Sequence, residues 1–125
     1  MILEILQESD IDRVEDVDLK SYLEYSLNRL PMDFEYFSNT AENGYFVVVT
    51  ELEDLINTSI TIGMHTLYSI ETELFWESVE LIEKSDSGVY EILVHVDTDI
   101  TISFILLESI LSEEIKEKIQ EFIYE

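Results

Sequence analysis

Acidic residues are interleaved with hydrophobic residues along this chain, and that pattern limits what the chain can fold into. The stretch SDIDRVEDVDLKSYLEY, residues 9–25, carries six carboxylates and two cations among residues that require burial. Over the whole chain, 29 acidic residues face 6 basic ones, which gives a formal net charge of −23. Apolar residues still make up 46 % of the chain, a content that acidic disordered chains lack. The sequence therefore predicts a folded domain whose surface carries the carboxylates.

The length and the missing residue types narrow the class of protein. A chain of 125 residues has the size of one domain, so we expect a single acidic domain over residues 1–125. There is no cysteine, which excludes disulfides, thiolate chemistry and Cys-based zinc sites. The N-terminal MILEILQESD lacks the basic region and the long apolar run of a signal peptide, and no stretch approaches the roughly 20 apolar residues that span a bilayer. These features predict a cytoplasmic protein, in the host cell cytoplasm if a phage encodes it.

The first half of the chain predicts strands around one helix. ILEIL at residues 2–6 is expected to form an edge strand. Leucines at helical spacing predict a helix over residues 19–30, which Asp16 or Asp18 caps and Pro31 ends. MDFEYFS alternates as a strand does, the Asn-Gly of NTAENG indicates a hairpin turn, and YFVVVTEL reads as the next strand.

The second half predicts further strands and a final helix. SITIGMHTLYSI, residues 59–70, is expected to be one strand with a bulge at Gly63. ETELFWESVELIEK fits helical spacing in part, but we favour a strand for its second half, paired across SDSG with VYEILVHV. VYEILVHV and ITISFILL, joined at DTD, form the clearest hairpin. The segment SEEIKEKIQEFIYE predicts a helix with Ser112 as its cap. Its expected buried stripe is Ile115, Ile119, Phe122 and Ile123.

Together these elements predict an α+β fold. We expect an antiparallel β-sheet of about five to seven strands, with one helix from the N-terminal half and a C-terminal helix packed on it. Pro and Gly are too few to mark a linker, which agrees with one domain.

Motifs for metal binding and catalysis are weak or missing. His95, Asp97 and Asp99 would share one face of a straight strand, and such ligands can hold a metal. We prefer the alternative that residues 97–99 form a hairpin turn, and we predict no metal and no cofactor. His65 is interpreted as structural. No nucleophile motif and no glycine-rich phosphate loop occurs, and carboxylate pairs are too numerous to single out an acid and a base, so we expect no enzyme.

The acidic clusters are the remaining signal, and we predict that they bind a partner. The predicted partner-binding residues are Asp10, Asp12, Glu15, Asp16 and Asp18, then Glu73, Glu77 and Glu80, and finally Glu108, Glu113, Glu114, Glu117 and Glu121. Alternate strand residues lie about 6.5–7 Å apart and helical i, i+4 neighbours about 6 Å apart. These separations are close to that of successive phosphates along a nucleic-acid strand. Aromatic residues near the clusters, among them Tyr22, Tyr25, Tyr36, Tyr68, Tyr90 and Trp76, are typical of tight interfaces and equally of a core.

This charge excludes direct binding to nucleic acid or to an anionic membrane, since phosphates repel it, and favours a basic partner. The small, acidic, cysteine-free composition resembles that of phage anti-restriction and anti-CRISPR proteins. That resemblance implies an inhibitor that mimics nucleic acid and blocks a CRISPR effector or restriction enzyme. A homodimer of this inhibitor is compatible with that role. Three alternatives stay open. They are an immunity protein or antitoxin for a basic nuclease toxin, an acidic escort of histone-like proteins, and adaptation to high salt.

Overall fold

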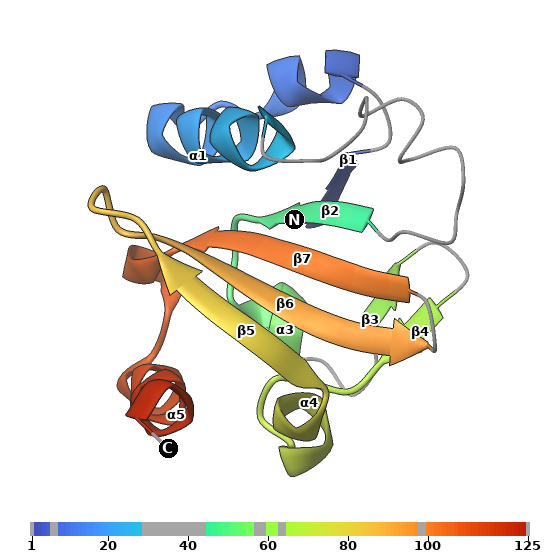
Figure 1. Cartoon of the computed structure of the whole chain (residues 1–125), viewed down its shortest axis with the longest axis vertical. Coiled ribbons are helices and arrows are strands. Elements are labelled where there is room, and N and C mark those ends of the chain that lie inside the picture. Colours follow the sequence, from blue (N-terminus) through green and yellow to red (C-terminus); the bar gives the residue numbers. More distant parts are fainter. Residues whose placement is uncertain are drawn as a thin grey trace.

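A mixed five-stranded sheet forms the centre of the molecule (Figure 1). The computed structural model describes residues 2–5, 8–28, 45–56, 60–62, 65–97 and 100–124. The sheet has the strand order β1–β2–β7–β6–β5. Its strands are β1 (Ile2–Ile5), β2 (Tyr45–Val49), β5 (Val79–Lys84), β6 (Val89–Asp97) and β7 (Ile100–Leu107). The α+β class, the approximate strand number and the presence of helices in both halves of the chain are confirmed.

One pairing differs from the antiparallel sheet that we expected. β1 and β2, β6 and β7, and β5 and β6 pair antiparallel, whereas β2 and β7 run parallel, with Val47 opposite Phe104. Parallel neighbours need a long crossover connection. The chain between Val49 and Ile100 supplies one, because it includes β5 and β6 before it returns to the centre. The order of strands along the chain could not reveal this pairing.

The two central strands are buried on both faces of the sheet. Val47 and Val49 of β2 belong to the core on one face, while Phe46 and Val48 belong to the core on the other. In β7, Phe104 belongs to the same core as Val47, and Ile105 belongs to the same core as Val48. Burial on both sides explains why these strands read as continuous apolar runs and not as alternating ones.

One face of the sheet is covered by the N-terminal helices. The 3-10 helix η1 (Glu8–Arg13) leads into α1 (Val17–Asn28), which lies above the sheet in Figure 1. Leu19 and Leu23 of α1 pack with residues of β1 and β2 in this core. The helix begins at Val17, two residues before its predicted start at Leu19. Residues 29 and 30, the end of the predicted helix, lie outside the described residues.

The opposite face carries the other helices of the described ranges. These are α3 (Glu53–Ile56), α4 (Glu73–Glu77), the 3-10 helix η2 (Glu108–Ile110) and α5 (Glu113–Tyr124). Phe75 of α4 and Ile115 and Ile119 of α5 are buried here, and the amide of Ile115 donates to Ser112 Oγ at 3.3 Å, as the predicted cap requires. Figure 1 shows α4 and α5 on the side of the sheet away from α1. The predicted stripe of α5 is wrong at its end, since Ile123 is 45 % exposed.

The middle of the chain departs most from the prediction. Residues 59–70 were expected to form one strand, but they contain two, β3 (Ile60–Ile62) and β4 (His65–Leu67), which pair antiparallel as a separate small sheet. The strand expected at residues 32–38, the turn at 39–44 and the bulge at Gly63 lie outside the described residues. Across residues 71–84, a short helix precedes β5, so the preferred strand for the second half is confirmed.

The predicted hairpins β5–β6 and β6–β7 are confirmed by their registers. In the turn between β5 and β6, Gly88 has a φ of 84°, a left-handed conformation that favours glycine. None of the helices in the described ranges combines the length and the apolar character that crossing a membrane requires.

Candidate partner-binding surface

The predicted N-terminal acidic cluster is largely engaged within the fold. Asp16 caps α1, because its Oδ1 accepts hydrogen bonds from the amides of Asp18 at 2.9 Å and Leu19 at 3.0 Å. Asp10 is buried and its Oδ1 lies 3.7 Å from a guanidinium nitrogen of Arg13. Asp12 Oδ1 lies 3.6 Å from Lys20 Nζ. Three of the five carboxylates predicted here therefore hold η1 and α1 in place or face a cation, which leaves Glu15 and Asp18 as exposed acids.

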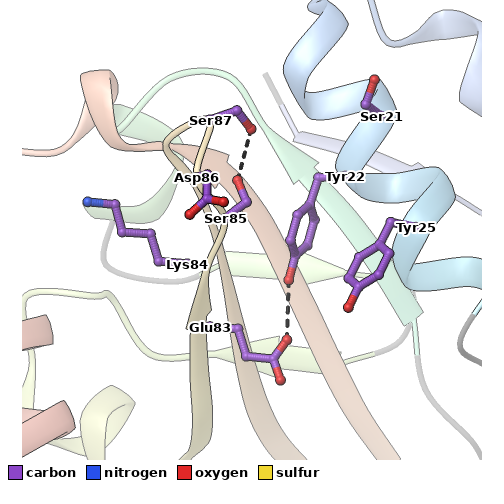
Figure 2. Close-up of a pocket in the computed structure, with 8 residues that line it drawn as sticks. All are labelled: Ser21, Tyr22, Tyr25, Glu83, Lys84, Ser85, Asp86 and Ser87. Carbon is purple, nitrogen blue, oxygen red and sulfur yellow. Dashed lines mark hydrogen bonds between the residues drawn. The ribbon is translucent and has the colours of Figure 1, made fainter.

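A second group of acids lies beneath α1, at a polar pocket of about 590 Å³ between α1 and the β5–β6 turn (Figure 2). Glu83 and Glu91 stand opposite each other in the β5–β6 register, where like charges repel. The hydroxyl of Tyr22 lies 2.7 Å from Glu91 Oε1 and 3.5 Å from Glu83 Oε2, and Ser26 Oγ donates to Glu91 Oε1 at 2.9 Å. Figure 2 shows the Tyr22 ring directed toward Glu83.

The titration of Tyr22 reflects this setting. Burial, followed by the hydrogen bond to Glu91, raises the pKa of Tyr22 well above its usual range, because burial disfavours the charged phenolate and the nearby carboxylates add to that effect. The hydroxyl thus remains a donor and ties α1 to β5 and β6. We assign Glu91 a structural role, since it accepts hydrogen bonds from Tyr22 and Ser26 of α1.

Two further predicted residues face basic groups. Glu80 Oε1 lies 3.0 Å from Nδ1 of His95, and Glu108 Oε2 lies 3.1 Å from Lys84 Nζ. The hydrogen bond with Glu108 is the main cause that raises the pKa of Lys84. The described residues hold no group of three His, Asp or Glu side chains arranged for a metal. The side chains of Asp97 and Asp99 fall outside what the structure describes.

The remaining predicted acids gather on α4 and α5. Glu73 and Glu77 lie one helical turn apart on α4, and Glu121 lies on α5. All three border a groove of about 540 Å³ between the two helices, which we name the α4–α5 groove. Its other lining residues are Trp76, Val79, Lys118 and Phe122. The groove thus joins acids from two clusters that are separated in the sequence by β5, β6 and β7.

Aromatic side chains in the groove are held by the core. Trp76 and Phe122 are half-buried and pack against the core on this face. The indole Nε1 of Trp76 donates to the carbonyl oxygen of Ile70 at 2.7 Å, and the ring meets Phe75 edge to face with the centroids 5.6 Å apart. These contacts fix the orientation of the indole, so the groove has a preformed aromatic wall.

The acids of α4 and α5 have few counter-charges. Glu113 lies 3.7 Å from Lys116 Nζ, and its side chain is nevertheless 89 % exposed. Among the described residues, the exposed acids Glu73, Glu77, Glu114, Glu117 and Glu121 take part in no ion pair, and neither does Lys118. Most carboxylates of this surface therefore face no described cation, whereas Asp10 and Asp12 near α1 each face one.

The sequence identified the individual acids but not the groove. Trp76 was noted as an aromatic residue near acids, and Phe122 was expected on the buried stripe of α5. Lys118 was missed. The available signal was the pair Glu73 and Glu77 at helical spacing around Trp76, in the segment whose structure was ambiguous.

No protein-family model, no curated protein and no solved structure matches this chain. Function must therefore be inferred from the geometry and the charge of the chain itself. Within the described residues, the surface of α4 and α5 combines exposed acids, a groove and aromatic side chains, and it is the candidate partner-binding surface.

Proposed function

We propose that this protein is a stoichiometric inhibitor whose acidic surface mimics nucleic acid and occupies the binding channel of a basic DNA- or RNA-handling protein. A CRISPR effector or a restriction enzyme is the partner class that we favour, and the protein acts in the cytoplasm without catalysis. The observation that carries the proposal is the set of exposed acids on α4 and α5 that form no ion pair within the described residues. They belong to a chain with a net charge of −23.

The exposed acids on α5 follow helical spacing. Glu113, Glu117 and Glu121 lie at successive i, i+4 positions, and neighbours at that spacing are about 6 Å apart. Ile115 and Ile119 anchor the opposite side of the helix in the core. A rigid helix therefore carries its carboxylates at a separation similar to that of phosphates in a strand, which supports mimicry.

Binding is driven by electrostatics in this proposal. Net charge of opposite sign attracts the partner over long distances and raises the association rate, and salt screens the effect. Solubility needs a net charge of magnitude only about 2–8 in a small domain. The excess also destabilises the fold through self-repulsion, so a function that requires the charge accounts for it.

One observation favours a second candidate. Half-buried Trp76 and Phe122 line the α4–α5 groove, and aromatic anchors within a charged rim are typical of protein interfaces. An immunity protein that neutralises a basic nuclease toxin would use such an anchor, and it need not cover the nucleic-acid channel of the toxin.

A pull-down from bacterial lysates that contain CRISPR, restriction and nuclease-toxin systems tests the proposal. Capture of one nucleic-acid enzyme that excess duplex DNA displaces supports mimicry. A single partner that DNA does not displace supports the immunity role. Capture of nothing, or of all basic proteins equally, contradicts both.

A charge-reversed variant adds a test of the surface. Glu113→Lys/Glu114→Lys/Glu117→Lys should lose the captured partner while circular dichroism shows an unchanged fold, because all three residues are exposed. Undiminished affinity would remove the outer face of α5 from the proposed surface.

A further inference from the structure

We infer that the α4–α5 groove receives an arginine side chain from a basic segment of the partner protein, next to an apolar residue of the same segment. This inference rests on the proposed function and specifies the chemistry of its contact. Charge mimicry requires only a pattern of carboxylates. The groove adds a site that one kind of protein side chain fills and that a nucleic-acid strand could not fill. The groove, at about 540 Å³, lies within the range of pocket volumes, about 300–1,000 Å³, that take small molecules.

The lining of the groove matches a guanidinium. Trp76 and Phe122 offer aromatic surface, and Glu73, Glu77 and Glu121 stand around it. A guanidinium stacks on aromatic rings and is weakly hydrated, whereas an ammonium is a strongly hydrated point charge. Its planar fork also donates two parallel hydrogen bonds to one carboxylate. Arginine therefore suits this mixture of aromatic and acidic groups better than lysine does.

The charge of the groove argues against other occupants. Among the described residues that line the groove, three glutamates stand against one cation, Lys118, so phosphates and other anions are repelled. A neutral apolar segment would cover the carboxylates without compensating their charge, which is costly. A second copy of this chain would bring another net charge of −23 to the contact. Only a basic segment compensates the acids while its apolar residue covers the aromatic wall.

Trp76 gives a direct way to observe binding, since it is the only tryptophan in the chain. We would titrate the full chain with a short helical peptide that carries Arg at positions i and i+4 and Leu at i+3. One matched peptide has Lys in place of Arg, and another has Gln in place of Leu. Trp76 fluorescence reports occupancy of the groove, and anisotropy of labelled peptide reports binding anywhere on the protein.

The expected result is a saturable change in Trp76 emission with the Arg peptide. Both matched peptides should bind more weakly. Glu73→Gln/Glu77→Gln/Glu121→Gln should raise the Kd for the Arg peptide by roughly tenfold or more, because desolvated charged partners at interface centres contribute strongly. These residues are exposed, so the core is untouched.

The matched control is Glu15→Gln/Asp18→Asn/Glu24→Gln, which removes the same charge from exposed positions around α1 on the other face of the sheet. It should raise the Kd by no more than about threefold, through the long-range field alone. Equal weakening by both triple variants would overturn the inference. So would peptide binding by anisotropy without a change in Trp76 emission, or equal affinity for the Arg and Lys peptides.

The two proposals can fail separately. If the pull-down captures a DNA-displaceable enzyme and the groove variant captures it equally well, the groove inference is wrong and the proposed function stands. If the Arg peptide occupies the groove but no nucleic-acid protein is captured, the proposed function is wrong and the groove inference stands.

Discussion

The two faces of the sheet use their acidic residues in opposite ways. Around α1, several carboxylates accept hydrogen bonds or face cations, as Asp16 does at the start of the helix and Glu91 does beneath it, while Glu15, Asp18 and Glu24 are exposed. On α4 and α5, Glu73, Glu77 and Glu121 are exposed around a groove and form no ion pair with any described residue. The first group stabilises the fold, and the second forms the surface that we propose binds a partner.

This contrast shows that the density of acids along a sequence does not tell which acids are engaged within the fold. The stretch at residues 9–25 is the most conspicuous acidic segment, yet much of its charge holds η1 and α1 in place. The acids of α4 and α5 are as dense in the sequence, and they share one surface only because the fold brings the two helices together.

The largest effect should come from reversing charge at the groove. With Glu73→Lys/Glu77→Lys/Glu121→Lys, we expect the affinity for the captured basic partner to fall about 100-fold or more, because attraction becomes repulsion. Calorimetric titration measures the Kd, and thermal unfolding checks that the fold persists. An equal loss of affinity in Glu15→Lys/Asp18→Lys/Glu24→Lys would show that the two faces contribute equally to binding.

Removing a donor beneath α1 should affect stability and not binding. Tyr22→Phe deletes the hydroxyl that donates to Glu91, so we expect the free energy of unfolding to fall by about 2 kcal/mol. Urea denaturation measures it. An unchanged free energy of unfolding would show that the hydrogen bond from Tyr22 to Glu91 does not stabilise the fold.

The same variant makes a prediction about pH. The pKa of Tyr22 is raised in the folded state, so its contribution is fully present below the unfolded pKa of about 10 and is lost as pH rises above it. The stability difference between the wild type and Tyr22→Phe should therefore shrink between about pH 10 and the higher folded pKa. A difference that stays constant across that range would contradict the assignment.

A smaller effect is expected at the start of α1. Asp16→Ala removes the helix cap and should cost about 1 kcal/mol of stability. The matched change Glu117→Ala, at an exposed position within α5, should stay within about 0.5 kcal/mol of the wild type. Chemical denaturation measures the free energy of unfolding of both variants. Equal losses would show that the hydrogen-bonded acid Asp16 contributes no more to stability than the exposed acid Glu117.

The smallest effect should appear at Lys118, the cation among the described residues of the groove. Lys118→Gln removes a positive charge that opposes an incoming arginine, so the Arg peptide should bind about twofold more tightly. Trp76 fluorescence gives the Kd. Weaker binding would show that Lys118 contributes to the contact and does not oppose it.

Local patterns accounted for much of the fold. Helical spacing and Ser112 predicted α5, Asp16 was one of two candidate caps of α1, and the β6–β7 hairpin followed from its two apolar runs. These features depend on residues a few positions apart. The split of residues 59–70 into β3 and β4 was not predicted, because alternation is the same in one strand as in two that fold back on each other.

The sequence by itself determined the net charge, the α+β class and the identity of the acids. Tertiary structure alone decided the parallel pairing of β2 with β7, the engagement of Glu91 by Tyr22, and the meeting of α4 with α5 at one groove. The reason is physical. Charge and local periodicity are properties of neighbouring residues, whereas counter-charges, donors and grooves come from packing between segments that are distant in the chain.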